Sequence, residues 1–514
     1  MNRVFKHVLI CCLMFTGAGA TAQNGFKADK TTAPKTYDPM IFGQFIEHFH
    51  RQIYGGIFEP GSPLADADGF RKDVVEALLE LKIPIIRWPG GCFVSSYHWL
   101  DAVGPDRQPT HDKAWDVEDP NTFGTAEFVK WCKLINAEPY ICTNAGTGTP
   151  EEMSDWVEYC NRDIGRYGRM RKAHGYPEPF KVKYWSIGNE NYMWGEIGHK
   201  PKDEWVRTIV ESARIMNAVD PDIKLFAATW PDEQWIEPIL KSTANLIDYI
   251  SIHGYYGGQT STYMDIVSGT DAPEHQIKRT LAGIDKAGRR GKTKIAIDEW
   301  NPRAWHHPNY PAGNTAVPSS AKREDLIKER DKNDINSLYT MADAVFSACF
   351  LNTCLRYCDD VPIAGFSPVV NTRGALFVHP KGVVRRTTFH VLSMYANMLE
   401  KHFLPSQIQS DTLKHGDRKT LMLDVAITCN SDKTRFAIAA VNKHPDKAVT
   451  FAPDFAALTG STPKQVKAVA LTGTSKDDYN DVGNENRVVP TEITLKVDKG
   501  LITLPPHSVV IIKL

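Results

Sequence analysis

Lys183-Tyr-Trp-Ser-Ile-Gly-Asn-Glu-Asn191 combines an apolar strand pattern with a carboxylate at its end. Residues 182–187 alternate and are rich in aromatic and β-branched side chains, which is typical of a buried strand. Gly188-Asn189 breaks the pattern, so Glu190 stands where the chain leaves the strand. Lys294-Ile-Ala-Ile-Asp-Glu299-Trp-Asn301 has the same form. Parallel sheets and barrels keep their reactive groups at such strand ends.

Short apolar strands alternate with longer amphipathic helices on both sides of these two stretches. The expected strands are residues 41–45, 83–88, 139–142, 182–187, 224–228, 249–253, 294–298 and 362–366. Helical patterns lie between them, at residues 69–81, 125–135, 202–218, 274–289 and 336–355. Eight such units predict an α/β protein with a (β/α)8 TIM barrel. A doubly wound open sheet is the competing fold, but the dinucleotide fingerprint typical of it is missing.

The pattern changes after a helix that ends near Leu399. Beyond it only short strands separated by turn residues are expected, at residues 422–427, 435–441, 465–471, 492–497 and 508–513. We therefore predict a catalytic barrel over residues 23–399 and a structural, antiparallel β-sandwich of jelly-roll type over residues 400–514. The extreme N-terminal segment is a candidate to pack on that sandwich.

The composition of the 514-residue chain is that of an ordinary globular enzyme, with 42% apolar and 24% charged residues. A formal net charge of −1 gives no electrostatic reason to expect a nucleic acid or a membrane surface as partner. The length favours a large catalytic unit with a smaller second domain.

The N-terminus has the parts of a secretory signal peptide. Arg3 and Lys6 precede the apolar run Val8–Phe15, and Ala20-Thr21-Ala22 offers a small-x-small cleavage site. The apolar run is far below the ~20 residues that a membrane span needs. We predict that residues 1–22 are a signal peptide and that the protein is exported, to the periplasm or the medium.

Metal ligation and disulfide bonding are not indicated by the cysteine and histidine spacing. The eight cysteines after the signal show no C-x-x-C pair, so a zinc site is not expected, and nothing in their spacing demands a disulfide. His48 and His50, like the pair His306-His307, lack the further ligands that would complete a metal site. No metal or other cofactor is expected.

Glu190 and Glu299 together suggest glycoside hydrolysis. They follow the fourth and seventh expected strands, whose ends face each other across a closed barrel. A retaining glycosidase needs one ionised carboxylate as nucleophile and one protonated carboxyl as acid, roughly 5 Å apart. Arg87 could keep a nearby carboxylate ionised, and Asn189 could bind a sugar hydroxyl beside the acid.

Six runs of the chain resemble, in order, the α-L-arabinofuranosidases of glycoside hydrolase family 51. These runs are Gly43-Gln-Phe-Ile-Glu-His48, Ile53-Tyr-Gly-Gly-Ile-Phe-Glu-Pro60, Ile86-Arg-Trp-Pro-Gly-Gly-Cys-Phe-Val-Ser95, Trp185-Ser-Ile-Gly-Asn-Glu190, Ile252-His-Gly-Tyr-Tyr256 and Ile297-Asp-Glu-Trp-Asn301. The resemblance covers the chain from about Gly43 to Asn397. It implies a (β/α)8 barrel with a C-terminal β-sandwich, a homo-oligomer, and a retaining double displacement. In that reaction Glu190 would be the acid/base and Glu299 the nucleophile.

The resemblance also implies substrate contacts. Glu47 corresponds to a glutamate that hydrogen-bonds arabinose hydroxyls, and Asn189 to an asparagine that contacts the 2-hydroxyl. Arg87 corresponds to an arginine beside the nucleophile, and Tyr255 to a tyrosine near it. His253 belongs to the same motif as Tyr255 and is expected at the substrate.

Three further positions bear on specificity. Trp115 resembles an aromatic residue that stacks on the next sugar along the chain. Cys92 stands where many relatives have Asn, and is expected at the substrate with less capacity for hydrogen bonding. Pro368 falls where some relatives have a Gln that contacts the sugar.

The leading hypothesis is an exo-acting, retaining α-L-arabinofuranosidase that releases terminal arabinofuranosyl groups from arabinose-containing polysaccharides or oligosaccharides. A rival of the same class would cleave another sugar, such as a β-D-galactofuranoside or a β-glucan. A rival of another class is a non-catalytic barrel that only binds carbohydrate. A nicotinamide-dependent oxidoreductase is disfavoured because no glycine-rich fingerprint is present.

Overall fold

The computed structural model describes residues 24–28, 31–304, 328 and 330–514. The predicted signal peptide and the pair His306-His307 lie outside these residues. Among the helices of the described ranges, none is long and apolar enough to cross a membrane.

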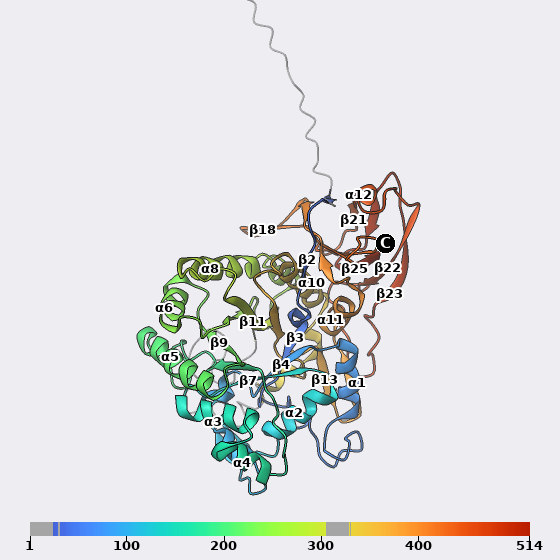
Figure 1. Ribbon diagram of the computed structural model, residues 1–514. Helices are drawn as coiled ribbons and strands as arrows, with labels where there is room; N and C mark the ends of the chain where they lie inside the picture. Colours follow the sequence, from blue (N-terminus) through green and yellow to red (C-terminus); the bar gives the residue numbers. More distant parts are fainter. Residues whose placement is uncertain (1–23, 29–30, 305–327, 329) are drawn as a thin grey trace, which may run out of the picture.

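Eight parallel strands close into a barrel in which each strand pairs with the next barrel strand along the chain, and the last pairs with the first (Figure 1). They are β3 (Gly43–Phe45), β4 (Ile85–Trp88), β7 (Glu138–Cys142), β8 (Tyr184–Ile187), β9 (Lys224–Ala228), β10 (Tyr249–Tyr255), β11 (Lys294–Asn301) and β12 (Ile363–Phe366). All eight predicted strands and the predicted barrel are confirmed. The short apolar runs indicated these strands in the sequence, because strands covered on both faces are rich in apolar residues.

The strand boundaries differ from the prediction where local chemistry intervenes. β3 begins two residues late because residues 39–42 form a 3-10 turn, capped by the Asp38 side chain. β4 begins after Pro84, which has no N–H for the ladder. β11 runs on to Asn301, so Glu299 lies within the strand. The sequence predicted a position just beyond the end of the strand.

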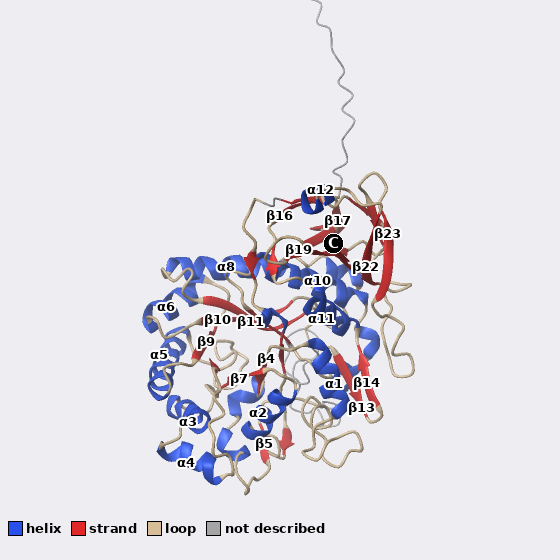
Figure 2. Ribbon diagram, turned by 45° about the vertical axis from the view of Figure 1, so that its right-hand side comes forward, coloured by secondary structure: helices blue, strands red, loops and turns tan. Residues whose placement is uncertain are grey.

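Helices surround the barrel (Figure 2). They are α1 (Lys72–Leu81), α2 (Thr125–Leu134), α3 (Pro150–Asn161), α4 (Gly165–Ala173), α5 (Lys202–Val219), α6 (Glu233–Thr243), α7 (Tyr263–Val267), α8 (Ala272–Lys286), α10 (Met341–Arg356) and α11 (Thr387–Met398). The predicted start of α10 at residue 336 was wrong. Thr340 forms a capping box with Asp343, which fixes the first turn at Met341.

The C-terminal region forms a separate sheet of seven strands together with β2 (Lys35–Thr36) from near the start of the chain. The strand order is β2-β15-β19-β20-β25-β22-β23, in which β15 is His402–Phe403. The five predicted strands correspond to β19 (Leu423–Cys429), β20 (Phe436–Asn442), β22 (Gln465–Leu471), β23 (Thr491–Lys496) and β25 (Ser508–Lys513). Short hairpins and pairs complete the region, namely β17 (Thr412–His415) with β18 (Arg418–Leu421) and β21 (Val449–Phe451) with β24 (Ile502–Leu504). The region has its own apolar core.

The start of the described chain joins this C-terminal region. β1 (Gly25–Ala28) pairs antiparallel with β16 (Ser406–Gln409), and β2 (Lys35–Thr36) pairs with β15 (His402–Phe403). The first strands are therefore paired with the C-terminal strands and not with the barrel (Figure 1).

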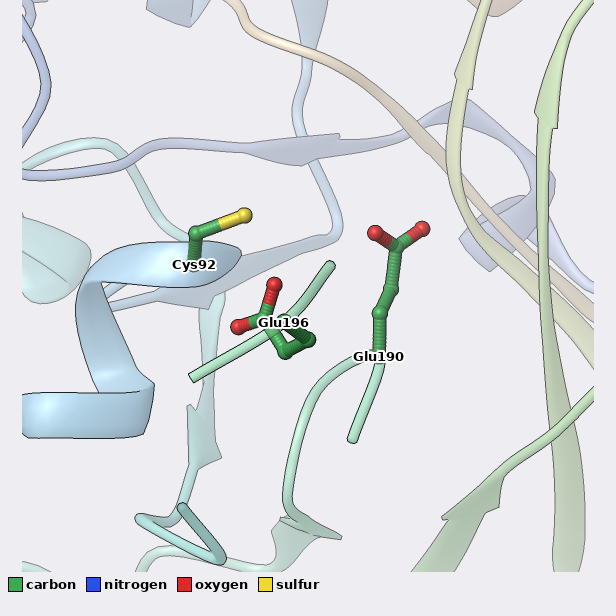
Figure 3. A group of neighbouring side chains, drawn as sticks. All are labelled: Cys92, Glu190 and Glu196. Carbon is green, nitrogen blue, oxygen red and sulfur yellow. The ribbon is translucent and has the colours of Figure 1, made fainter. Parts of the chain in front are cut away.

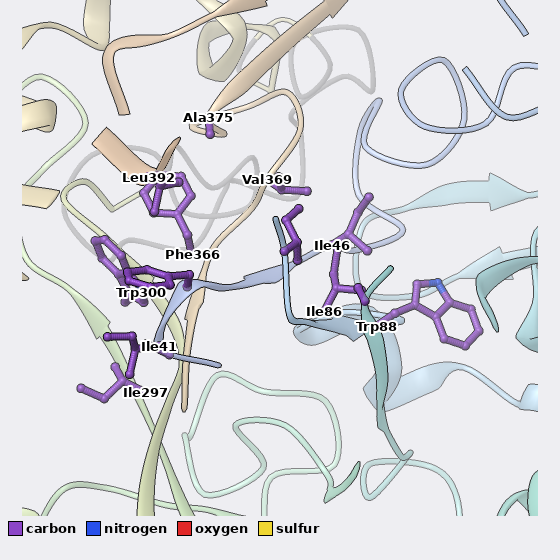
Figure 4. Close-up of a cluster of buried hydrophobic side chains, with 14 of the residues drawn as sticks. Ile41, Ile46, Ile86, Trp88, Ile297, Trp300, Phe366, Val369, Ala375 and Leu392 are labelled. Carbon is purple, nitrogen blue, oxygen red and sulfur yellow. The ribbon is translucent and has the colours of Figure 1, made fainter. Parts of the chain in front are cut away.

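The main core lies between the barrel strands and their helices. Figure 4 shows part of it, including Ile86, Trp88, Trp300 and Phe366, all of which are buried. The Trp300 ring stacks on Phe350 of α10 with ring centroids 3.6 Å apart. This packing holds β11, which carries Glu299, against the helix behind it.

A smaller apolar cluster fills one end of the barrel interior. Its buried members come from six strands: Ile85, Tyr140, Tyr184, Phe226, Ala296 and Ile363. Side chains two residues further along a strand point to the same face. The next interior layer is therefore formed by residues such as Arg87, Cys142 and Asp298, and it is polar. The apolar layer is the base on which a polar pocket is built.

Candidate active site

Arg87 is the centre of the polar layer. Its side chain is 1% exposed and donates from Nη1 to Glu299 Oε2 at 2.8 Å, and from Nη2 to Asn189 Oδ1 at 2.7 Å. Nη2 also contacts Cys142 Sγ at 3.3 Å. A buried guanidinium needs such acceptors, and its planar fork fixes their positions. Arg87 thereby ties the end of β8 to β11.

Glu299 lies at an irregularity of β11. The registers with β10 and β12 both shift around it, between Ser251 and His253 and between Ile297 and Trp300. A bulge of this kind re-aims a side chain. Burial alone would raise the pKa of Glu299, but the charges of His253 and Arg87 hold it below its ordinary value. The carboxylate is therefore ionised and suited to nucleophilic attack.

Tyr255 donates a hydrogen bond to Glu299 Oε1. Burial raises the pKa of Tyr255 well above its usual range, so the phenol keeps its proton and remains a donor. The phenol oxygen also accepts from Arg373 Nη2 at 2.8 Å and lies 3.0 Å from Ser367 Oγ. Arg373 and Ser367 were not predicted as site residues. They come from the segment after β12, in which the sequence analysis singled out only Pro368.

Glu190 lies in the turn that follows β8, and His253 links it to Glu299. His253 Nδ1 lies 2.8 Å from Glu190 Oε1 and 3.5 Å from Glu299 Oε2. Burial would lower the pKa of His253, but the two carboxylates raise it to about 9. At neutral pH the imidazole is therefore a cation that donates to Glu190.

The two candidate catalytic carboxyl groups are close together. One oxygen of Glu190, one oxygen of Glu299 and a ring nitrogen of His253 all lie within 4.8 Å of one another. Retaining glycosidases hold their carboxyl groups about 5 to 5.5 Å apart, whereas inverting ones need about 6.5 to 9.5 Å to admit a water. The separation in this site suits direct attack by one of the carboxylates.

Glu47 follows β3, and its carboxyl group lies on the same side of the pocket as Glu299. Its Oε1 accepts from the Phe93 backbone N–H at 3.0 Å and from Trp115 Nε1 at 3.3 Å. Burial, with the nearby charge of Glu299, raises the pKa of Glu47 to about 8. At neutral pH it is a protonated carboxyl that can donate to a hydroxyl as well as accept.

The approach of Glu47 to the loop after β4 requires a glycine. Gly90 has φ +148°, and a β-carbon there would lie 2.3 Å from Cγ of Glu47. A β-carbon on Gly91 would lie 3.4 Å from Glu47 Oε1 and 3.6 Å from Glu299 Oε2. The Gly90-Gly91 pair thus lies against both carboxyl groups and leaves space for them.

Asn189 and Cys92 complete the predicted set. The Asn189 side chain is fully buried, and its Nδ2 has no hydrogen-bond partner within the described residues. A buried donor of this kind can bind a substrate hydroxyl. Cys92 begins the 3-10 turn after β4, and its Sγ lies within 4.8 Å of oxygens of Glu190 and Glu196.

The structure brings all nine predicted site residues to one end of the barrel. They are Glu47, Arg87, Cys92, Trp115, Asn189, Glu190, His253, Tyr255 and Glu299. Trp115 is buried and packs on Phe49, with ring centroids 4.6 Å apart. Pro368 follows Ser367 through a cis peptide bond, directly beside the Tyr255 contact.

Glu196 is a site residue that the sequence did not reveal. It is 8% exposed and accepts from Ser95 Oγ at 2.5 Å. Burial, followed by the charge of Glu190, raises its pKa to about 7. Glu196 follows no strand and belongs to no strand-end motif. It reaches the pocket because the loop after β8 folds back toward Glu190.

His48 and His50, the two described histidines considered as metal ligands, have carboxylate partners. His48 pairs with Asp119 at 2.7 Å and His50 with Asp334 at 2.8 Å. The eight cysteines after the predicted signal are all free thiols, and all but Cys92 are buried. Glu190, His253 and Glu299 have ligand-like spacing, but a protonated imidazole has no lone pair for a cation.

Two family models match the chain. One describes an α-L-arabinofuranosidase 1 domain and covers residues 77–270, and the other describes an α-L-arabinofuranosidase C-terminal domain and covers residues 298–508. Among curated proteins, an intracellular exo-α-(1→5)-L-arabinofuranosidase of Acetivibrio thermocellus is 35% identical over 453 residues, which are 83% of this chain and 88% of that protein. The α-L-arabinofuranosidase C of Emericella nidulans is 33% identical over 93% of this chain and 94% of that protein.

Solved structures give the same result. An α-L-arabinofuranosidase from Thermotoga maritima, crystallised with arabinose, has a TM-score of 0.84 and 33% identity, over 96% of this chain and all of that one. The GH51 α-L-arabinofuranosidase of Thermotoga petrophila has a TM-score of 0.83 at the same identity and coverage. A family 44 xyloglucanase of Paenibacillus polymyxa, at 10% identity and a TM-score of 0.59, shares the fold alone.

Proposed function

The chain belongs to the α-L-arabinofuranosidases of glycoside hydrolase family 51, and from that premise we propose that Glu299 and Glu190 carry out a retaining double displacement. The observation that carries the proposal is the approach of their carboxyl oxygens to within 4.8 Å. This close approach favours the narrow carboxyl spacing of a retaining reaction over the wider spacing of an inverting one.

The first step forms an arabinosyl-enzyme ester. A Glu299 oxygen attacks the anomeric carbon, and the bond from that carbon to the leaving oxygen breaks as Glu190 donates its proton to that oxygen. In the second step Glu190 accepts a proton from water, and the water oxygen displaces Glu299. Free arabinose and the starting enzyme result, with the original anomeric configuration.

The neighbours of Glu299 prepare it for attack. Arg87 and Tyr255 each hydrogen-bond one of its oxygens, which orients the carboxylate and keeps it ionised. Glu47 and Asn189 offer the donors and acceptors that a furanose ring needs, at a wall next to the nucleophile. Pre-set groups of this kind lower the barrier because they do not reorganise during the reaction.

A series of aryl α-L-arabinofuranosides tests the assignment. Glu299→Ala should abolish turnover of every member, since no covalent step is left. Glu190→Ala should lower kcat/KM by about 10² to 10⁴-fold for poor leaving groups, and much less for activated ones that depart without a proton. Near-wild-type turnover by either variant on a poor leaving group would overturn the assignment.

We propose that the substrate is a terminal, non-reducing arabinofuranosyl group on an arabinose-containing polysaccharide or oligosaccharide. A panel of aryl glycosides that includes β-D-galactofuranoside and β-glucoside separates this proposal from cleavage of another sugar. Preference for the α-L-arabinofuranoside by at least about tenfold in kcat/KM is expected. Single arabinose units released from linear arabino-oligosaccharides would indicate exo action.

We propose further that the protein is exported. The basic start, the apolar run Val8–Phe15 and the Ala20-Thr21-Ala22 site support this, whereas the relative from Acetivibrio thermocellus is named as intracellular. Fractionation of cells that express the full chain should yield a mature protein beginning at Gln23 outside the cytoplasm. Full-length protein in the cytoplasm would contradict the proposal.

A further inference from the structure

A third carboxyl group lies beside Glu190 and has no role in the two steps above. One oxygen of Glu196, one oxygen of Glu190 and the sulfur of Cys92 lie within 4.8 Å of one another. Figure 3 shows the three side chains side by side, with Cys92 on a helical turn and both glutamates on the loop after β8. Two carboxyl groups this close in a buried site interact strongly.

The loop that carries Glu196 holds it firmly. The Glu190 carbonyl accepts from the Met193 N–H at 2.7 Å, and the Met193 carbonyl accepts from the Glu196 N–H at 3.0 Å. The Asn191 side chain donates to Ser95 Oγ at 3.2 Å, and Ser95 in turn donates to Glu196. The separation between the two carboxyl groups is therefore a fixed feature of the fold.

We propose that Glu196 is a positioning residue that shares a proton with Glu190 and so keeps the acid/base protonated for the first step. This inference rests on the proposed function, in which Glu190 donates to the leaving oxygen. The need for such a group comes from the first step, in which Glu190 must hold a proton although the cationic His253 ring lies 2.8 Å from its Oε1, and a cation beside a carboxyl group favours loss of that proton. A second carboxyl group nearby acts in the opposite sense.

Charged and titratable groups from several elements act on the pair. They are Glu47 after β3, Arg87 on β4, Cys92 on the following turn, His253 on β10, and Asp298 and Glu299 on β11. Glu196 is the carboxyl group on the Cys92 side of Glu190, whereas Glu299 is on the His253 side.

Two carboxyl groups that interact in this way lose their protons in two steps that belong to the pair. Burial and the charge of Glu190 raise the pKa of Glu196 to about 7, so below neutral pH Glu196 holds a proton beside Glu190 that the pair can share.

The test compares wild-type enzyme with Glu196→Gln, which keeps the shape and an acceptor for Ser95 but cannot ionise. The pH dependence of kcat/KM is measured with a phenyl α-L-arabinofuranoside, which needs the acid, and with a dinitrophenyl one, which does not. For the phenyl substrate the alkaline limb should move about one pH unit or more to lower pH, since like charges shift a carboxyl pKa by about 1 to 3 units. For the dinitrophenyl substrate it should stay in place.

Glu196→Asp, which restores a carboxyl group, should return the limb toward its wild-type position. An unchanged limb with the phenyl substrate, or equal shifts with both substrates, would overturn the inference. The comparison of the two substrates also separates the effect of Glu196 from that of groups such as Glu47 and His253, which affect the turnover of both substrates alike. Glu190→Gln, measured alongside, keeps the two proposals apart: if it retains full activity on the phenyl substrate, the proposed function itself fails.

Discussion

Tyr255 is the residue whose hydroxyl group most directly favours the ionised form of Glu299. It donates to one Glu299 oxygen while Arg87 donates to the other. A donor to a carboxylate lowers its pKa, because it stabilises the charged form alone. The pocket therefore sets the charge of the nucleophile with neutral as well as positive groups.

Tyr255→Phe should raise the pKa of Glu299, since a donor to its ionised form is lost. The nucleophile must be ionised, so the acid limb of kcat/KM should move to higher pH by about one unit, with about a tenfold loss below that limb. Tyr256→Phe is the matched control, because the Tyr256 hydroxyl donates to Gln276 at 2.8 Å and not to Glu299. An acid limb that moves in neither variant, or equally in both, would contradict this account.

Glu47→Gln should retain more activity than Glu47→Ala, because Glu47 is protonated below its pKa of about 8 and an amide also donates. As the pH rises through 8, the wild-type side chain gains a charge beside Glu299 and the amide does not. The ratio of kcat/KM for Glu47→Gln over wild type should therefore rise between neutral and alkaline pH. A falling ratio would show that the ionised carboxylate is the required form.

At the residue scale the sequence predicted the groups that end strands. Glu190 and Glu299 were found because apolar runs lead directly to them, and Arg87 because it lies within such a run. Glu196 and Arg373 were missed, because each lies on a loop that folds back into the pocket. A loop position has no periodic pattern, so its place is set by tertiary contacts alone.

Among the elements, β11 differs from its predicted form in a way that matters for function. The apolar run ends at Ile297, yet the strand continues to Asn301 with irregular registers on both sides. Pairing with β10 and β12 extends a strand beyond its apolar run, and single-sequence patterns do not report such pairing. The consequence for function is that Glu299 is held by two neighbouring strands.

The loop after β4 should tolerate no side chain at Gly90. In Gly90→Ala the methyl group would displace Glu47, so KM should rise, and the strained backbone should cost about 1 to 3 kcal/mol of stability. Gly61→Ala is the control, since Gly61 has φ +86° but nothing within 4 Å of the added carbon. It should lose stability and keep KM; an increase in KM for both would mean that backbone strain alone disturbs the site.

For the whole molecule, α10 connects the barrel to the C-terminal sheet. Asp424 of β19 accepts from Arg356 at 2.9 and 3.2 Å and from Asn352 at 2.9 Å, both on α10. The barrel was predicted because its eight units repeat. The short pairs of the C-terminal region, such as β17 with β18, were not, because strands of three or four residues carry little pattern.

Asp424→Ala should lower the free energy of unfolding by about 2 kcal/mol, less than for a fully buried pair because Arg356 keeps some solvent contact. Thermal unfolding would measure the loss, and kcat/KM should not change, since the side-chain partners of Asp424 are on α10 and not in the polar layer. Asp432→Ala, at an exposed turn of the same sheet, should leave stability unaltered. If kcat/KM of Asp424→Ala also fell at temperatures where the variant is folded, the C-terminal sheet would be shown to influence the geometry of the active site.

The most direct test of the account is to trap the arabinosyl-enzyme. Glu190→Ala, mixed with a dinitrophenyl α-L-arabinofuranoside, can complete the first step without an acid but lacks the base for the second. Mass spectrometry of the digested protein should find one arabinosyl group on the peptide that contains Glu299. Attachment at another residue, or a burst of released dinitrophenol with no sugar on the protein, would contradict direct attack by Glu299.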